Sequence, residues 1–139
     1  MISLHDYYMD RDVEYRILLT PELRDNATTT VHKANLLLAA AVNAGVYVNV
    51  DHVTGTLVAS GWRPPAVNSK TNGAARASKH MTCQAIDIND DEGELDNWCM
   101  NNQDKLAEIG LWLEHPSATK GWCHLQVVPP KSGNRVFYP

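Results

Sequence analysis

The chain has 139 residues, of which 44% are hydrophobic and 20% are charged, and its net charge is −4 at pH 7. This balance is typical of a globular domain, and it argues against disorder and against a nucleic-acid or anionic-membrane partner attracted by charge. No apolar run approaches the roughly 20 residues of a membrane-spanning helix. We therefore expect one domain over residues 1–139, without membrane insertion. The three cysteines form no CxxC pair and are expected to be buried thiols.

The first nineteen residues show no clear period, although VEYRILL is compatible with a short strand or a helical turn. Thr20 followed by Pro21 predicts a helix start, because threonine caps helices and proline is favoured at the first helical position. Gly45 is placed to end this helix. The spacing of its apolar residues predicts an amphipathic helix, with Val31, Ala34, Leu38, Ala41 and Val42 on the buried face.

The middle of the chain predicts a hairpin, a loop and a strand. VYVNVDHVTGTLVASG contains two runs rich in β-branched residues around a turn at residues 51–55, which is typical of a hairpin. Residues 62–76 are rich in proline, asparagine and glycine and predict a long loop, and long ordered loops are often functional. QAIDIND, at residues 84–90, predicts a strand.

The last part of the chain predicts one helix and two strands. The helix covers residues 94–109, with an interruption near Asn101 and Asn102, and ends at Gly110. The strands are LWLE at 111–114 and GWCHLQVV at 121–128, and the turn-rich tail after them is expected on the surface. Helices and strands are segregated along the chain, so we predict an α+β fold with a small antiparallel sheet flanked by helices.

Strand periodicity places polar side chains where they can meet. Asp87 lies between two isoleucines and therefore faces the opposite side of its strand. If this strand pairs antiparallel with residues 121–128, Asp87 can lie across from His124. His80, in the loop before the first strand, can close the third corner. Two imidazoles and a carboxylate, with a fourth position open to solvent, form the ligand set of a catalytic zinc, so we predict a Zn²⁺ site here.

Three segments, SGWRPPAVN, SKHMTCQAIDI and GWCHLQ, occur in this order. Together they resemble the zinc D-Ala-D-Ala metallopeptidase family, which includes D-Ala-D-Ala carboxypeptidases and phage endolysin L-alanyl-D-glutamate peptidases. That family has an SGYRP-like strand end, an SxHxxGxAxD segment and a WxH segment. The resemblance implies the small α+β sheet shared with the Hedgehog signalling domain, and zinc bound by His80, Asp87 and His124.

The resemblance also implies roles around the metal. Arg63 matches the arginine that steadies the developing oxyanion, and Ser78 matches a serine near the substrate. Trp122 shares a strand face with His124 and is expected to flank the substrate site. His115 is expected at the substrate rim, because it would point away from zinc if its strand continued.

Two positions depart from the family pattern. Cys83 and Gln84 stand where TGxAxD is usual, which we interpret as a packing change. Gly121 stands where many members carry an acidic general base, and such a hydrolase needs a carboxylate to accept a proton from water. Glu114 is our predicted replacement, because a hairpin of residues 111–114 with 121–128 would bring it near His124.

We therefore expect a zinc peptidase that hydrolyses peptidoglycan stem peptides or cross-links. The alternatives are a D,D-carboxypeptidase or dipeptidase, and a zinc-stabilised wall-binding or virion structural domain without activity, which Gly121 supports. The acidic, polar N-terminus predicts cytoplasmic synthesis without a signal peptide. We accordingly expect a monomeric phage or prophage product that reaches the wall through a holin or in the virion. The pattern leaves open which bond is cut.

Overall fold

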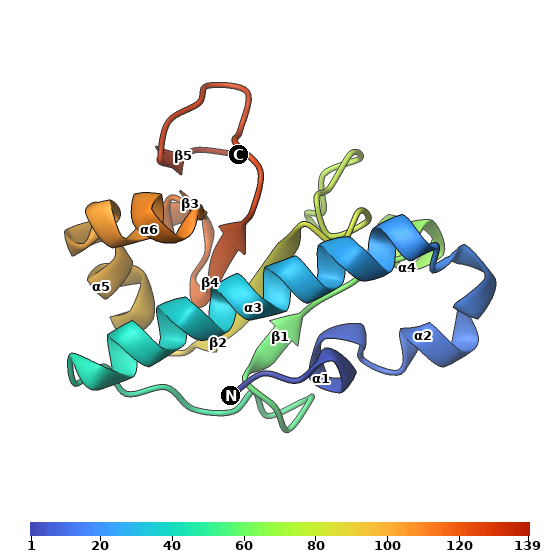
Figure 1. The fold of residues 1–139 in the computed structure, drawn as a ribbon, viewed down its shortest axis with the longest axis horizontal. Coiled ribbons are helices and arrows are strands. Elements are labelled where there is room, and N and C mark those ends of the chain that lie inside the picture. The colour runs from blue at the N-terminus through green and yellow to red at the C-terminus, as the bar shows by residue number, and fades with distance from the viewer.

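The computed structural model describes residues 1–139 and has a five-stranded sheet, in the order β1-β2-β4-β3-β5, flanked by helices (Figure 1). The strands are β1 (Val58–Ser60), β2 (Ala85–Asp90), β3 (Trp112–Glu114), β4 (Gly121–Gln126) and β5 (Val136–Phe137). The helices are α1 (Leu4–Tyr8), α2 (Arg11–Glu14), α3 (Pro21–Asn43), α4 (Pro65–Lys70), α5 (Glu94–Asn101) and α6 (Gln103–Ile109), with short 3-10 helices η1 (Arg16–Leu18) and η2 (Pro116–Ala118). The predicted α+β class is confirmed.

The central strands β2 and β4 pair antiparallel along their whole length, from Ala85 opposite Gln126 to Asp90 opposite Gly121. Every second side chain enters the hydrophobic core; Ile86, Ile88, Cys123 and Leu125 are fully buried there. Burying each large apolar side chain contributes about 1.5 to 3 kcal/mol. Because side chains alternate between the two faces of a strand, this core fixes the polar partners of β2 and β4 on the opposite face.

Helix α3 lies across one face of the sheet and provides much of that core (Figure 1). It begins as predicted: Thr20 Oγ1 accepts a hydrogen bond from the Leu23 amide at 3.2 Å, and Pro21 is the first helical residue. It ends near Gly45, whose φ of 94° is in the left-handed region that favours glycine. Val42 was wrongly placed on the buried face: it is 48% exposed, and Leu37 is buried instead. No helix has both the length and the apolar character needed to cross a membrane.

The N-terminal segment, which had no clear sequence period, folds into α1, α2 and η1. Ser3 and Asp6 form a capping box at the start of α1, in which each side chain accepts a hydrogen bond from the other residue's amide at 3.0 Å. Tyr7 is fully buried, and its hydroxyl donates to the Ala85 carbonyl of β2 at 2.8 Å. The segment is thus joined to the strand that carries Asp87.

The predicted hairpin at residues 46–61 is only half correct. Asp51 organises the turn, since its Oδ1 accepts hydrogen bonds from the Val53 and Thr54 amides. Only the second run forms a strand, β1, and it pairs with β2 rather than with residues 46–50. The first run instead contacts a side chain of the sheet, because Asn89 Nδ2 donates to the Asn49 carbonyl at 3.1 Å.

Two further expectations need correction and one is confirmed. The predicted loop at 62–76 contains α4, which begins at Pro65. The tail adds β5, which pairs parallel with β3 through Val136 opposite Leu113, so the sheet is not purely antiparallel. The predicted interruption of the helix at 94–109 is confirmed, because α5 and α6 are separated at Asn102 and α6 ends at Gly110 with φ 88°.

Replacing Tyr7 with phenylalanine should remove the buried hydrogen bond to β2 while leaving the ring in place. We expect Tyr7→Phe to lower the free energy of unfolding by about 1 to 3 kcal/mol, the usual cost of leaving a buried acceptor, here the Ala85 carbonyl, without its partner. Tyr47→Phe is the matched control, since Tyr47 is 72% exposed. Urea unfolding measures the free energy of unfolding of both variants. Equal stability of Tyr7→Phe and Tyr47→Phe would contradict the role given to the Tyr7 hydroxyl.

Candidate metal centre

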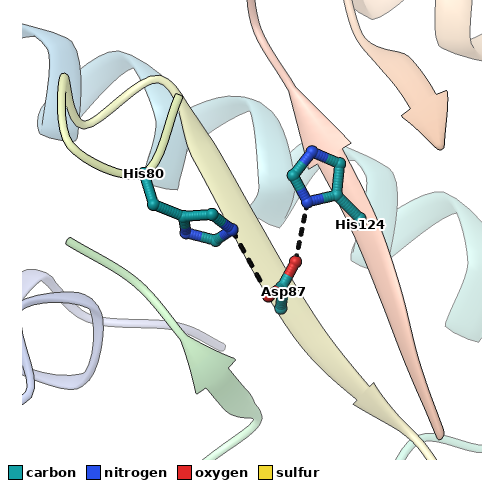
Figure 2. Close-up of side chains that lie close together, drawn as sticks. All are labelled: His80, Asp87 and His124. Carbon is teal, nitrogen blue, oxygen red and sulfur yellow. Dashed lines mark hydrogen bonds and ion pairs between the residues drawn. The ribbon is translucent and has the colours of Figure 1, made fainter. Parts of the chain in front are cut away.

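Three side chains from separate segments converge on the face of the sheet opposite the core (Figure 2). Asp87 on β2 is directly opposite His124 on β4, as the strand periodicity predicted, and Asp87 Oδ1 lies 2.8 Å from His124 Nδ1. His80 approaches from the preceding loop, with Nε2 at 3.3 Å from Asp87 Oδ2. The possible ligand atoms of the three residues all lie within 4.8 Å of one another. All three residues are buried.

The His80 ring is held by the strand end that contains the SG motif. Its Nδ1–H donates to the Gly61 carbonyl at 2.8 Å, which leaves Nε2 without a proton in the neutral ring. Nε2 is buried and makes no hydrogen bond. Residue 61 must be glycine for this arrangement, since a Cβ there would lie 1.8 Å from the Tyr7 carbonyl oxygen of α1.

The His124 ring is oriented from both sides. Nδ1 faces Asp87, whereas Nε2 lies 3.3 Å from Gln126 Oε1 on the same strand. Gln126 is itself positioned, because its Nε2 donates to the Val128 carbonyl at 2.8 Å. Strand alternation places Gln126 on the same face of β4 as His124, but the residue pattern assigned Gln126 no role. The face-sharing pattern was the only available signal for it.

These residues fit a zinc ion. Two imidazole nitrogens and a carboxylate are the ligands of many catalytic zinc sites, and zinc-bound histidines usually donate their other ring N–H to a carbonyl or carboxylate. Here His80 Nε2 is buried, makes no hydrogen bond and is directed toward Asp87. The other ring nitrogen, Nδ1, donates its proton to the Gly61 carbonyl, as a zinc-bound histidine usually does. The residues that could hold the ion are therefore His80 through Nε2, His124 through Nδ1, and the Asp87 carboxylate.

The electrostatics of the cluster are dominated by Asp87. Burial by itself would raise the pKa of Asp87, but His80 and His124 outweigh burial and hold that pKa well below its usual range. Burial would likewise lower the pKa of His124, but the hydrogen bond and charge of Asp87 raise it. The pKa of His80 is lowered because its burial outweighs the attraction of Asp87. Asp87 is therefore charged and His80 neutral, the forms in which these two side chains could bind a metal ion.

Glu114 is the carboxylate nearest to this trio. Strand β3 pairs antiparallel with β4, as predicted, and places Glu114 Oε2 at 3.9 Å from His124 Nδ1. Its side chain is 18% exposed, and burial raises its pKa while His124 opposes that rise. Gly121 is the first residue of β4 and lies opposite Asp90. It precedes His124 by three residues, so the two residues are about 10 Å apart along the extended strand. The structure thus has an acid beside the cluster, contributed by a different strand from the usual family position.

Arg63 also reaches Asp87. Its backbone amide donates to the His80 carbonyl at 3.1 Å, and its Nη2 lies 4.0 Å from Asp87 Oδ2. Burial lowers the pKa of Arg63, and the charge of Asp87 opposes this. Its Nε is buried without a hydrogen-bond partner.

The other three predicted site residues lie around the cluster. Ser78 Oγ accepts a hydrogen bond from the His80 amide at 3.2 Å. Trp122 is partly exposed on the face that carries His124, two residues away on β4. His115 caps η2 by accepting from the Ser117 amide, and its ring stacks on Tyr138 at 4.5 Å, so it is not part of the ligand group. Their contacts with substrate stay predictions.

The cysteines near the site are buried thiols. Cys83, which replaces a family glycine, has a φ of 58°, in the left-handed region where glycine is favoured, and this explains why glycine suits the position. Burial raises the pKa of Cys83 to about 12, which keeps it protonated at neutral pH. Cys123 is fully buried in the core, on the opposite face of β4 from His124.

A family model described as Peptidase M15 matches residues 19–120, which is most of the chain. The matched region includes Arg63, His80, Asp87 and Glu114 and stops before His124. Neither a curated protein nor a solved structure matches the chain.

If the trio binds zinc, removing one ligand should reduce metal content without unfolding the core. We expect His80→Ala and Asp87→Ala to lose stoichiometric zinc, because two remaining donors make a much weaker site. His115→Ala is the control and should keep zinc, since His115 is outside the cluster. Elemental analysis of purified protein, with circular dichroism to monitor folding, provides the measurement. A folded variant that retained one zinc per chain would remove the mutated residue from the ligand set.

Proposed function

The chain belongs to the peptidase M15 family, whose members are zinc-dependent peptidases, and we propose that it hydrolyses a peptide bond in peptidoglycan stem peptides or cross-links. The observation that carries this proposal is the placement of Glu114 beside the buried cluster of His80, Asp87 and His124. A metal-ligand set with an adjacent half-buried carboxylate is the minimum machinery for such hydrolysis.

We assign the metal to the two histidines and Asp87. When bound there, zinc would polarise the scissile carbonyl and increase the acidity of water. The hydrogen bond from His80 to Gly61 presents a neutral ring nitrogen to the ion, and Gln126 orients His124. Because these supporting groups are already in place, little side-chain reorganisation would accompany metal binding.

Glu114 is our proposed general base. Its carboxylate lies beside His124 rather than within the ligand set, so it is free to accept a proton from water and return it to the leaving amine. Partial burial raises its pKa, which makes it a better proton acceptor than an exposed glutamate. This placement supplies the acid that is missing at Gly121, and it therefore favours an active enzyme over the inactive structural alternative.

Arg63 is our proposed oxyanion-stabilising residue. The guanidinium borders Asp87 and has an unpartnered Nε. A fixed, partly dehydrated cation stabilises negative charge that develops on a carbonyl oxygen much more strongly than water does. Ser78, which accepts from the His80 amide, and Trp122, on the β4 face that carries His124, are proposed substrate contacts, as is His115.

We also propose a cell-wall lytic role in a phage, with the protein released by a holin or carried in the particle. Its support is the resemblance of the SGWRPPAVN, SKHMTCQAIDI and GWCHLQ segments to those of phage endolysin peptidases. Endopeptidase and D,D-carboxypeptidase activities would yield different fragments, so fragment masses distinguish them.

The proposal predicts that Glu114→Gln retains zinc but loses cleavage. We expect the rate to fall by roughly 100-fold or more, the usual contribution of a general base. Glu108→Gln is the control, because Glu108 is exposed on α6 and pairs only with Lys105. The measurement is mass spectrometry of fragments released from purified peptidoglycan. Full activity in Glu114→Gln would assign the base elsewhere, and a zinc-loaded wild type that cuts nothing would favour the structural alternative.

A further inference from the structure

The last strand brings an aromatic ring to the candidate metal centre. Phe137 lies on β5, beyond residues 19–120 that the family model matches. The centroid of its ring is 6.2 Å from that of the His124 ring, and the two ring planes are at 81° to each other. Aromatic pairs prefer this edge-to-face arrangement at separations of about 4.5 to 7 Å. One of the three proposed metal ligands therefore packs against a side chain that sequence analysis gave no role.

Strand pairing places Phe137 in one row with the centre. Asp87 is paired with His124 across β2 and β4. Glu114, on β3, has its Oε2 3.9 Å from His124 Nδ1, and its partner on the other side is Phe137 on β5. Residues that are paired across strands project from the same face of a sheet. The four side chains thus form a row across β2, β4, β3 and β5, with Phe137 at its outer end.

The position of Phe137 is determined by the sheet. Its carbonyl accepts a hydrogen bond from the His115 amide at 2.7 Å, and the Arg135 carbonyl accepts one from the Leu113 amide at 2.9 Å. The Arg135 guanidinium also lies over the Trp112 ring of β3, 4.4 Å from its centroid. Strand β5 is therefore fixed on both sides of Val136, and the half-buried Phe137 ring with it.

The His124 ring needs such a neighbour when it binds a metal ion. The last side-chain torsion of histidine has a broad energy profile, so the surroundings decide where the ring points. In this structure Asp87 and Gln126 contact the two ring nitrogens. The bond between Nδ1 and Asp87 would be lost if both groups faced a metal ion instead of each other. Packing against Phe137 involves neither nitrogen, so it would continue to restrain the ring.

We propose that Phe137 is a positioning residue, whose ring holds the imidazole of His124 in the orientation that presents Nδ1 to the metal. This inference rests on the proposed metal site and peptidase function. A residue that acts through His124 in this way should affect the strength of metal binding but leave the ligand set unchanged.

The test compares three variants of β5. Phe137→Ala removes the ring, and Phe137→Leu keeps apolar bulk without the edge-to-face contact. Val136→Ala is the matched control, because Val136 pairs with Leu113 and packs against the core, so its truncation loosens β5 without removing a contact of His124. Competition with a chromophoric chelator measures the zinc dissociation constant, and urea unfolding of the metal-free proteins measures their stability. The absorption spectrum of the Co²⁺-loaded proteins reports the geometry of the ligands.

We expect Phe137→Ala to weaken zinc binding about tenfold or more, the usual effect of losing a group that orients a metal ligand. Its Co²⁺ spectrum should also differ from that of the wild type. Phe137→Leu should bind zinc with an affinity between those of the wild type and Phe137→Ala. Val136→Ala should be less stable to urea but keep the zinc affinity and the Co²⁺ spectrum of the wild type.

Two results would overturn the positioning role: wild-type zinc affinity in folded Phe137→Ala, or an equal loss of affinity in Val136→Ala, which would assign the effect to the docking of β5. If Phe137→Ala does not fold, Phe137→Leu provides the test, and wild-type affinity in that variant would refute the role. A wild type that binds no zinc would overturn this inference together with the metal site.

Cleavage of peptidoglycan by the zinc-loaded wild type is measured in parallel. A wild type that cuts nothing, while its zinc affinity depends on Phe137 as expected, would refute the peptidase function and leave the positioning role intact.

Discussion

A buried carboxylate in the middle of the sheet is the interaction around which this molecule is arranged. Asp87 is only 8% exposed, and an isolated charge at that depth would be strongly destabilising. Three basic side chains approach it from three directions: His124 from β4, His80 from the preceding loop, and Arg63 from the end of β1. Since each of the two histidines is fixed by another group, Asp87 and its neighbours form a preorganised site rather than a chance ion pair.

The N-terminal segment extends this arrangement beyond the family match. Helix α1 places the Tyr7 carbonyl so close to Gly61 that no side chain fits there, and Gly61 in turn accepts the hydrogen bond of His80. Arg11 holds the next carbonyl along the chain, that of Trp62. A segment outside the matched residues 19–120 therefore supports a proposed metal ligand through backbone contacts. Apart from the glycine required at position 61, this support depends on tertiary contacts that the residue types of the N-terminal segment do not reveal.

Strands β2 and β4 could be predicted from the sequence because side chains alternate between the two faces of a strand, and neighbouring residues alone show this alternation. Alternation gave the faces on which Asp87 and His124 lie, and an assumed antiparallel pairing then placed them opposite each other. Glu114 was predicted because the family resemblance left Gly121 at the usual acid position, and an assumed hairpin brought it near His124. The errors arose where distant partners decide the outcome. Residues 46–50 match a strand in composition, but they bond to the side chains of Asn89, Asp91 and Glu94 rather than to a strand. Strand β5 pairs along the edge of β3, a partner that local sequence does not reveal. The supporting role of Gln126 could not be predicted, because it depends on the orientation of the His124 ring.

In the proposed metal site, two imidazole nitrogens and the Asp87 carboxylate bind one zinc ion. Zinc-edge X-ray absorption on the purified, zinc-loaded protein tests it most directly, since it reports the ligand elements and their distances. We expect one zinc per chain with nitrogen and oxygen neighbours at about 2.0 to 2.2 Å, including the scattering pattern of imidazole, and no sulfur. A sulfur neighbour at about 2.3 Å would instead place the ion on the cysteines, and a protein that took up no zinc would refute both the metal site and the peptidase function proposed for it.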